Sequence, residues 1–184
     1  MNSELEVLRD VVARLEGAGI AYMLTGSVAM AVYAEPRMTR DIDIVVELAQ
    51  GDAPRMVELF SPDYYVSSEA VESAVATRGL FNLFHLARLV KVDLIVRKDD
   101  EFQRQEFSRR QRHHLGEFAA WVISKEDLIL AKLLWAASTD SEFQLRDVRR
   151  LLASGVDRAY LDQWSVTIGV DALLRKCGDA GHGV

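Results

Sequence analysis

Three aspartates occupy positions from which their carboxylates could bind one metal ion together. Asp41 and Asp43 lie two residues apart at the start of an apolar run, and Asp93 lies within a second apolar run. Alternate side chains of a strand point to the same face, so Asp41 and Asp43 would lie about 7 Å apart on one face. Carboxylates held this close repel each other unless a proton or a cation neutralises them. Mg²⁺ is such a cation, because its protein sites usually combine one or two carboxylates with substrate phosphate oxygens.

A glycine–serine pair precedes these aspartates and opens an alanine-rich helical segment. The apolar run 20–24 is followed by Gly26-Ser27. Glycine lets a ligand approach the backbone closely, and a helix N-terminus offers unpaired N–H groups to phosphate. The pattern therefore predicts a phosphate-binding turn beside the two aspartates. The alternative is an ordinary turn before a helix, followed by two aspartates at the exposed start of a strand.

Asp93 belongs to the second of two strands predicted at 81–86 and 89–96, joined near residues 87–88. Alternation places Asp93 on one face with Lys91 and Ile95, and the intervening apolar residues on the other. If that face is the one that carries Asp41 and Asp43, the three carboxylates form one site. The alternative is an exposed aspartate on an edge strand.

Composition limits the class of protein. The chain has 184 residues, of which 49% are hydrophobic, enough for one compact domain with a small appendage. No apolar run is long enough to span a bilayer, the first residues lack a signal-peptide pattern, and the lone Cys177 cannot form an internal disulfide. We therefore expect a cytoplasmic protein with no membrane partner. The net charge of −6 argues against sequence-independent nucleic-acid binding, but it leaves room for an enzyme acting on one RNA end.

Hydrophobic periodicity and end signals predict the supporting helices. They are expected at 3–17, directly after Gly26-Ser27, and at about 53–60, 69–77, 99–107, 128–137, 142–153 and 158–168. Ser124 is the expected cap of the helix at 128–137, with Asp127 as its capping-box partner. The glycine-rich tail 178–184 is expected to be disordered.

Charged residues in the second half of the chain allow two interpretations each. The basic stretch 109–114 could contact phosphate, or it could be a solvated strand or loop. Lys132 lies on an apolar helical stripe, and Asp147 lies on the apolar stripe of the next helix. The two could form an ion pair between the helices, or Lys132 could reach a substrate phosphate.

The motifs Gly26-Ser27, Asp41-Ile42-Asp43 and Asp93 together resemble the nucleotidyltransferase superfamily related to DNA polymerase beta. The neighbourhood 36–44 looks most like stand-alone prokaryotic members, which are compared with abortive-infection-type toxin nucleotidyltransferases. The resemblance covers residues 20–96. It implies an α/β (α+β) fold in which a mixed β-sheet is flanked by helices. It also implies a nucleotidyltransferase core at 1–119 and a small C-terminal helical subdomain at 120–184.

The resemblance also implies an activity: Mg²⁺-dependent transfer of a nucleoside monophosphate from an NTP to an acceptor hydroxyl. Two Mg²⁺ ions, or Mn²⁺ in their place, would be held by three residues that are also catalytic: Asp41, Asp43 and Asp93. The triphosphate would be bound by four residues, Gly26, Ser27, Arg40 and Lys132, with two further candidates in Arg37 and Asp147. Many relatives carry an aspartate where this chain has Arg150, so the family's acceptor chemistry need not carry over unchanged.

The first expected acceptor is an RNA 3′ end, particularly that of tRNA, and a protein hydroxyl is the second. The resemblance further implies a cognate antitoxin or toxin protein as a partner. Two alternatives stay open: a non-catalytic nucleotide-binding or antitoxin-like protein, and an enzyme that adds AMP to a partner protein. Relatives of the latter kind usually carry an arginine in the helix after Gly-Ser, whereas this chain has none at 28–33.

Overall fold

The computed structural model describes residues 3–34 and 41–179. Its centre is a seven-stranded mixed sheet in the order β3-β4-β5-β2-β1-β7-β6. The strands are β1 (Tyr22–Leu24), β2 (Asp41–Val46), β3 (Tyr64–Tyr65), β4 (Leu80–His85), β5 (Lys91–Val96), β6 (Gln111–Leu115) and β7 (Phe118–Val122). Two pairs are parallel, β2 with β5 and β1 with β7, and the others are antiparallel. The mixed sheet confirms the expected fold class.

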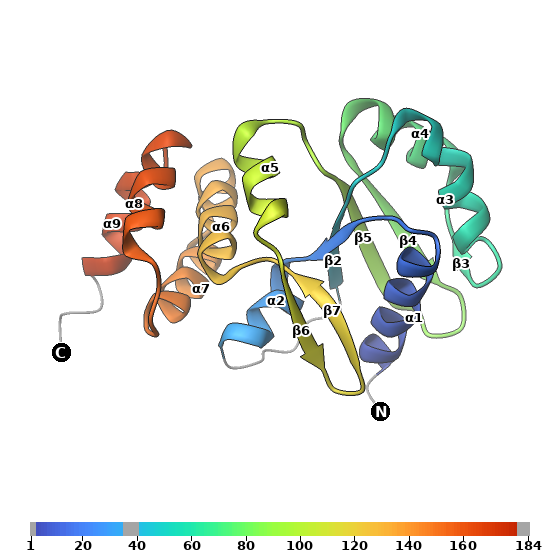
Figure 1. Ribbon diagram of the computed structural model, residues 1–184, viewed down its shortest axis with the longest axis horizontal. Coiled ribbons are helices and arrows are strands. Elements are labelled where there is room, and N and C mark those ends of the chain that lie inside the picture. Colours follow the sequence, from blue (N-terminus) through green and yellow to red (C-terminus); the bar gives the residue numbers. More distant parts are fainter. Residues whose placement is uncertain (1–2, 35–40, 180–184) are drawn as a thin grey trace.

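Helices lie around this sheet and beyond one end of it (Figure 1). They are α1 (Ser3–Gly17), α2 (Gly26–Tyr33), α3 (Ala53–Phe60), α4 (Ser68–Thr77), α5 (Glu101–Ser108), α6 (Lys125–Thr139), α7 (Glu142–Leu152), α8 (Arg158–Thr167) and α9 (Asp171–Asp179), with a 3₁₀ turn η1 (Gln50–Asp52) before α3. Helices α6 to α9 gather at the end of the molecule opposite α3 and α4 (Figure 1). No helix within the described ranges is both long and apolar enough to cross a membrane.

The alternation of side chains divides the central strands into a buried face and a face that carries the acids. Ile42 and Ile44 of β2, with Val92 and Leu94 of β5, are fully or almost fully buried. The opposite face of the same strands carries Asp41, Asp43, Lys91 and Asp93. Burial of the apolar residues therefore fixes the direction in which the acids point, because a one-residue slip would move the whole apolar set out of the core.

Several predicted elements are confirmed with shifts of one or two residues. Strands β4 and β5 form the predicted hairpin, and Ser124 caps α6 by accepting a hydrogen bond at its Oγ from the Asp127 backbone N–H, 3.2 Å away. Two features were not predicted: the β6–β7 hairpin and helix α9. The hairpin includes most of the basic stretch 109–114. The predicted boundary between residues 119 and 120 falls inside β7, and the division into two domains stays a prediction.

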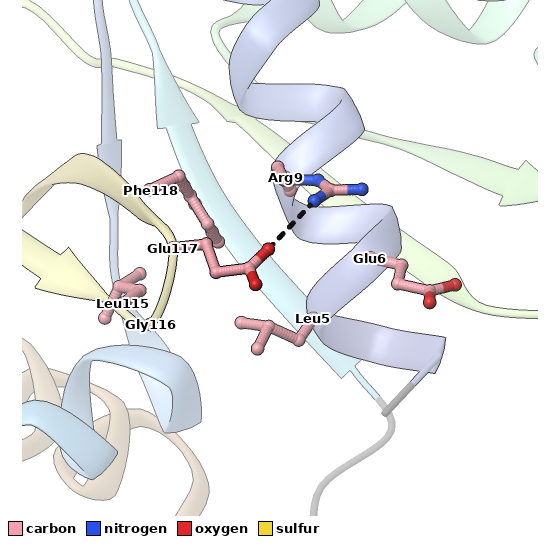
Figure 2. A pocket seen from close by; sticks show the side chains of 7 residues that line it. All are labelled: Leu5, Glu6, Arg9, Leu115, Gly116, Glu117 and Phe118. Atoms are coloured by element: carbon pink, nitrogen blue, oxygen red, sulfur yellow. Dashed lines mark ion pairs between the residues drawn. The ribbon is translucent and has the colours of Figure 1, made fainter. Parts of the chain in front are cut away.

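The β6–β7 turn rests on the N-terminal part of α1 (Figure 2). Leu5 is 36% exposed and borders a pocket that Gly116 and Phe118 also line, whereas Val7 is buried. Arg9 and Glu117 close the contact with an ion pair of 3.5 Å between Nη1 and Oε2 (Figure 2). The turn of the hairpin thus contacts the first half of α1.

Of the glycine-rich tail 178–184, Gly178 and Asp179 form the end of α9. The remainder of the predicted tail lies outside the described residues.

Candidate functional site

The register between β2 and β5 brings two of the predicted acids together. The strands run parallel, with Asp43 paired to Asp93 and Asp41 paired to Lys91. Paired residues on adjacent strands lie about 4.8 Å apart and point to the same face. Asp41, Asp43 and Asp93 therefore occupy one face of the two central strands, as the alternation predicted.

Asp43 lies directly against the glycine that opens α2. Gly26 has a φ of +59°, and a Cβ built on it would lie 2.0 Å from Asp43 Oδ2 and 2.8 Å from Asp43 Cγ. The backbone N–H of Thr25 donates to the Asp43 carbonyl oxygen at 3.0 Å, which fixes the turn against β2. Position 26 thus needs glycine for two reasons, the left-handed conformation and the contact with the carboxylate.

The negative charges around Asp43 change its protonation equilibrium. Burial raises the pKa of Asp43, and the nearby carboxylates of Asp93 and Asp41 raise it further. Lys91 and Lys132 act in the opposite direction. A carboxyl in this environment gains most from a bound cation, so the chemistry of the donor set fits a divalent metal ion.

Asp93 already has two partners from the protein. Lys91 Nζ lies 2.9 Å from Asp93 Oδ2, and Asn82 Nδ2 donates a hydrogen bond to Asp93 Oδ1. Lys91 Nζ also lies 4.0 Å from Asp41 Oδ1. Within residues 3–34 and 41–179, no group of three or more His, Cys, Asp or Glu side chains is arranged so that it could hold a metal ion. The three-aspartate metal site therefore stays a proposal.

Sequence reasoning missed the role of Asn82 and Lys91. Asn82 pairs with Asp93 across the β4–β5 hairpin, so its side chain must lie on the acid face. Alternation between the buried Phe81 and Leu83 was the signal that could have found it. Lys91 was placed on the correct face, but its contact with two of the acids requires the parallel register of β2 and β5, which no local pattern specifies.

Helices α6 and α7 contribute a buried charged pair. Lys132 and Asp147 are 3% and 2% exposed, and Lys132 Nζ lies 2.8 Å from Asp147 Oδ2 and 3.0 Å from Gln144 Oε1. The predicted ion pair between the two helices is therefore present. The charge of Lys132 acts to lower the pKa of Asp43, and α6 and α7 both contact α2, the helix that begins at Gly26.

The other residues predicted to bind phosphate differ in where the structure places them. Ser27 is the second residue of α2, and its Oγ donates a hydrogen bond of 3.4 Å to the Asp41 carbonyl oxygen. Arg37 and Arg40 lie outside the described residues. The arginines of the basic stretch have structural partners: Arg109 Nε lies 3.0 Å from Asp127 Oδ2, and Arg112 Nη1 lies 2.6 Å from Glu16 Oε1.

Solved structures of nucleotidyltransferases resemble this chain over most of its length. An antigenic nucleotidyltransferase-like protein from Paracoccidioides brasiliensis superposes with a TM-score of 0.58 at 18% identity, over 95% of this chain and 93% of the other. The lincosamide antibiotic adenylyltransferase LnuA, solved with lincomycin bound, gives a TM-score of 0.55 at 17% identity, over 83% and 96%. The chain has the nucleotidyltransferase fold.

A third solved structure with this fold is that of TM1012 from Thermotoga maritima. It gives a TM-score of 0.53 at 21% identity, over 75% of this chain and 88% of the other. No protein-family model matches the sequence, and no curated protein matches it either. At these identities the structural likeness establishes the nucleotidyltransferase fold, and the chemistry has to be argued from the residues of this chain.

Proposed function

We propose that the protein is a Mg²⁺-dependent nucleotidyltransferase that moves a nucleoside monophosphate from an NTP to an acceptor hydroxyl. The observation that carries the proposal is the parallel pairing of Asp43 with Asp93 directly beside Gly26 at the start of α2. This pairing puts carboxylates next to backbone N–H groups at a helix N-terminus. A metal–triphosphate complex needs both kinds of group, the first for the cation and the second for phosphate.

Each residue has a distinct role in this proposal. Asp41 and Asp43, with Asp93, would hold Mg²⁺, which in such sites neutralises the charge that develops on the attacking and leaving oxygens. The N–H groups at Gly26 and Ser27 would bind phosphate oxygens. The acceptor oxygen forms a bond to the α-phosphorus, the bond from that phosphorus to the bridging oxygen breaks, and pyrophosphate leaves. The acceptor proton passes to the carboxylate of Asp93.

The proposal gives four further residues a role in binding the triphosphate: Lys132, Arg40, Arg37 and Asp147. The charge of Lys132 already acts on Asp43, so it would also act on a triphosphate bound there. Asp147 would hold the Lys132 ammonium in place through their 2.8 Å contact. Arg37 and Arg40 are included on the basis of the sequence alone, because they are cationic residues shortly before Asp41.

The acid face continues into two exposed aromatic rings, which supports an RNA acceptor. Cross-strand pairing places Tyr65 beside Phe84, Phe84 beside Lys91, and Lys91 beside Asp41. Tyr65 and Phe84 are 61% and 42% exposed. Exposed aromatic side chains on a sheet stack unpaired bases, so an RNA 3′ end, that of tRNA first, is the acceptor we propose. As in the toxin nucleotidyltransferases that the motifs resemble, the proposal includes a cognate antitoxin as partner.

The likeness to LnuA supports a second acceptor class, the hydroxyl of a small molecule, because that protein is described as an antibiotic adenylyltransferase. The aromatic pair Tyr65 and Phe84 would then hold an apolar or planar part of the acceptor. An RNA acceptor and a small-molecule acceptor differ in which molecule receives the label from the NTP, so one assay distinguishes them.

The test is the transfer of label from each α-labelled NTP, with Mg²⁺, onto total RNA, total protein and a panel of lincosamide and aminoglycoside antibiotics. The Asp43→Asn variant removes one charge without changing side-chain shape and is the control. Labelled RNA that disappears in this variant supports the proposal and names the base. Labelled protein would favour an AMP-transferase, and a labelled antibiotic the second acceptor class. Binding of NTP without transfer to any acceptor would contradict an enzymatic role.

Within that assay, the aromatic pair has its own prediction. Tyr65→Ala and Phe84→Ala are each expected to lower transfer to RNA by about tenfold, because a base stacked on an aromatic ring contributes on the order of 1–3 kcal/mol. Tyr65→Phe keeps the ring and is the matched control. Unchanged transfer in both alanine variants would remove the argument for RNA that rests on these rings.

A further inference from the structure

The ammonium group of Lys91 lies between two of the carboxylates that the proposed function assigns to a metal. Its Nζ is 2.9 Å from Asp93 Oδ2 and 4.0 Å from Asp41 Oδ1. Asn82 hydrogen-bonds to the other oxygen of Asp93, so that carboxylate is held from both sides. A positive charge supplied by the chain itself therefore lies where a divalent cation would have to contact Asp93.

The partial exposure of Lys91 allows its side chain to move away from Asp93. The side chain of Lys91 is 34% exposed and that of Asp41 is 60% exposed, whereas Asp93 is only 13% exposed. Lysine carries its charge on a flexible four-carbon stem, and a partly exposed ammonium can change partner at small cost in solvation. By contrast, Asp93 is fixed by the sheet and by Asn82. The lysine is the movable member of the pair.

We propose that Lys91 is an internal counter-ion that competes with the divalent cation for Asp41 and Asp93 and so keeps the nucleotide-free protein poor in bound metal. The inference rests on the proposed function, because it concerns the metal site of that activity. A triphosphate arriving at the start of α2 offers the ammonium a new anionic partner, and the carboxylates become available when Lys91 moves to it. Metal and nucleotide then favour each other's binding, by the same factor in each direction.

The contacts of Asp93 agree with a site held by lysine. Its two oxygens face two different protein donors, Asn82 and Lys91, which is the arrangement expected of a carboxylate satisfied without a metal.

The experiment measures binding of Mn²⁺ to the full chain without nucleotide, from the electron paramagnetic resonance signal of free Mn²⁺. Lys91→Met removes the charge and keeps an unbranched side chain of similar length. It should bind Mn²⁺ about tenfold more tightly than the wild type, because a charge-assisted hydrogen bond no longer has to be broken. Lys91→Gln is a second neutral variant in case the methionine variant does not fold, and Lys91→Arg should bind as weakly as the wild type.

Lys98→Met is the matched control for net charge. Lys98 is exposed and lies two residues beyond the other end of β5, so its removal should change the affinity for Mn²⁺ by less than twofold. Adding Asp43→Asn to Lys91→Met should abolish the gain, which assigns the gain to this site. Equal affinities in the wild type and both neutral Lys91 variants would overturn the inference, as would an equal gain in Lys98→Met.

The test of the counter-ion role of Lys91 can be distinguished from the test of the proposed enzymatic function. A wild-type protein that transfers nucleotide, with Lys91 variants that bind Mn²⁺ no better, would overturn the counter-ion role alone. A tenfold gain in Mn²⁺ affinity, in a protein that transfers nothing, would support the counter-ion role and overturn the enzymatic one.

Discussion

Replacement of Gly26 by alanine tests the contact on which the site is built. Gly26 has a φ of +59°, a conformation that costs an L-residue about 1–2 kcal/mol. The new Cβ would also lie 2.0 Å from Asp43 Oδ2, so the carboxylate or the turn must shift. Overpacking of this kind costs about 1–3 kcal/mol. We expect Gly26→Ala to lower the free energy of unfolding by about 2–5 kcal/mol in urea denaturation and to abolish nucleotidyl transfer.

Gly169 provides the matched control. Its φ is +74°, but a Cβ built on it would meet nothing within 4 Å. Gly169→Ala should therefore carry the conformational cost alone, about 1–2 kcal/mol, and leave transfer unchanged. The difference between the two variants measures the contact between position 26 and Asp43.

A double-mutant cycle completes this test. Asp43→Ala removes the two Asp43 atoms closest to the new Cβ, Oδ2 and Cγ. In that background only the Cβ of residue 43, 3.0 Å from the new Cβ, stays in close contact. Gly26→Ala should therefore cost less than in the wild type, giving a coupling free energy of about 1 kcal/mol between positions 26 and 43. Equal costs for Gly26→Ala with and without the Asp43 carboxylate would refute the placement of this side chain against the glycine.

Three further predictions concern the buried polar groups. Burial, with Asp127 and Asp100 nearby, raises the pKa of Glu106 to about 8, so the folded protein holds a proton there that the unfolded chain releases above its ordinary pKa. This contribution is complete below the unfolded pKa and is lost as the pH rises to 8. Unfolding free energy should therefore fall by about 2–3 kcal/mol more between pH 6 and pH 8 in the wild type than in Glu106→Gln, and equal slopes would contradict the prediction. Lys132→Met removes the cation that lies 2.8 Å from the buried Asp147 carboxylate and should cost about 3–5 kcal/mol in urea unfolding. Lys132→Met/Asp147→Leu should be the more stable of the two while staying inactive, and a less stable double variant would be the contrary result. Tyr160 donates to Asp127 Oδ1 at 2.6 Å, so Tyr160→Phe should lower the melting temperature by the equivalent of about 1–3 kcal/mol; an unchanged melting temperature would count against a contribution from this hydrogen bond.

The acid face of the sheet was predictable because it depends on local alternation. Apolar residues on either side of Asp43 and Asp93 specify which way each strand faces, and the strands need only lie side by side for the carboxylates to meet. Gly26 was predictable in the same way, as a residue type suited to a turn beside phosphate. Its contact with Asp43 was not, since a distance of 2.0 Å between a hypothetical Cβ and a carboxylate depends on the tertiary arrangement of β1, α2 and β2.

Strand β6 was not predicted because it lacks a periodic apolar signal. Strand β6 contains Gln111, Arg112 and two histidines, and it is largely exposed at the edge of the sheet, so its alternation has no apolar face to detect. Arg112 instead pairs with Glu16 at the end of α1, 96 residues away in the chain. A long-range ion pair of this kind leaves no local pattern, and the basic stretch therefore resembles a phosphate-binding loop in the sequence.

The contrast between Lys91 and Lys132 shows why charge alone does not assign a role in this fold. Both cations lower the pKa of Asp43, and both are paired with an aspartate. Lys132 is buried between two helices, so removal of its charge takes a cation away from a buried carboxylate and lowers the stability of the fold. Lys91 is one-third exposed, so its charge can be removed at little cost to stability, and the consequence should appear in cation binding. Burial therefore divides the positive charges of the site into one that joins α6 to α7, Lys132, and one that can exchange partners, Lys91.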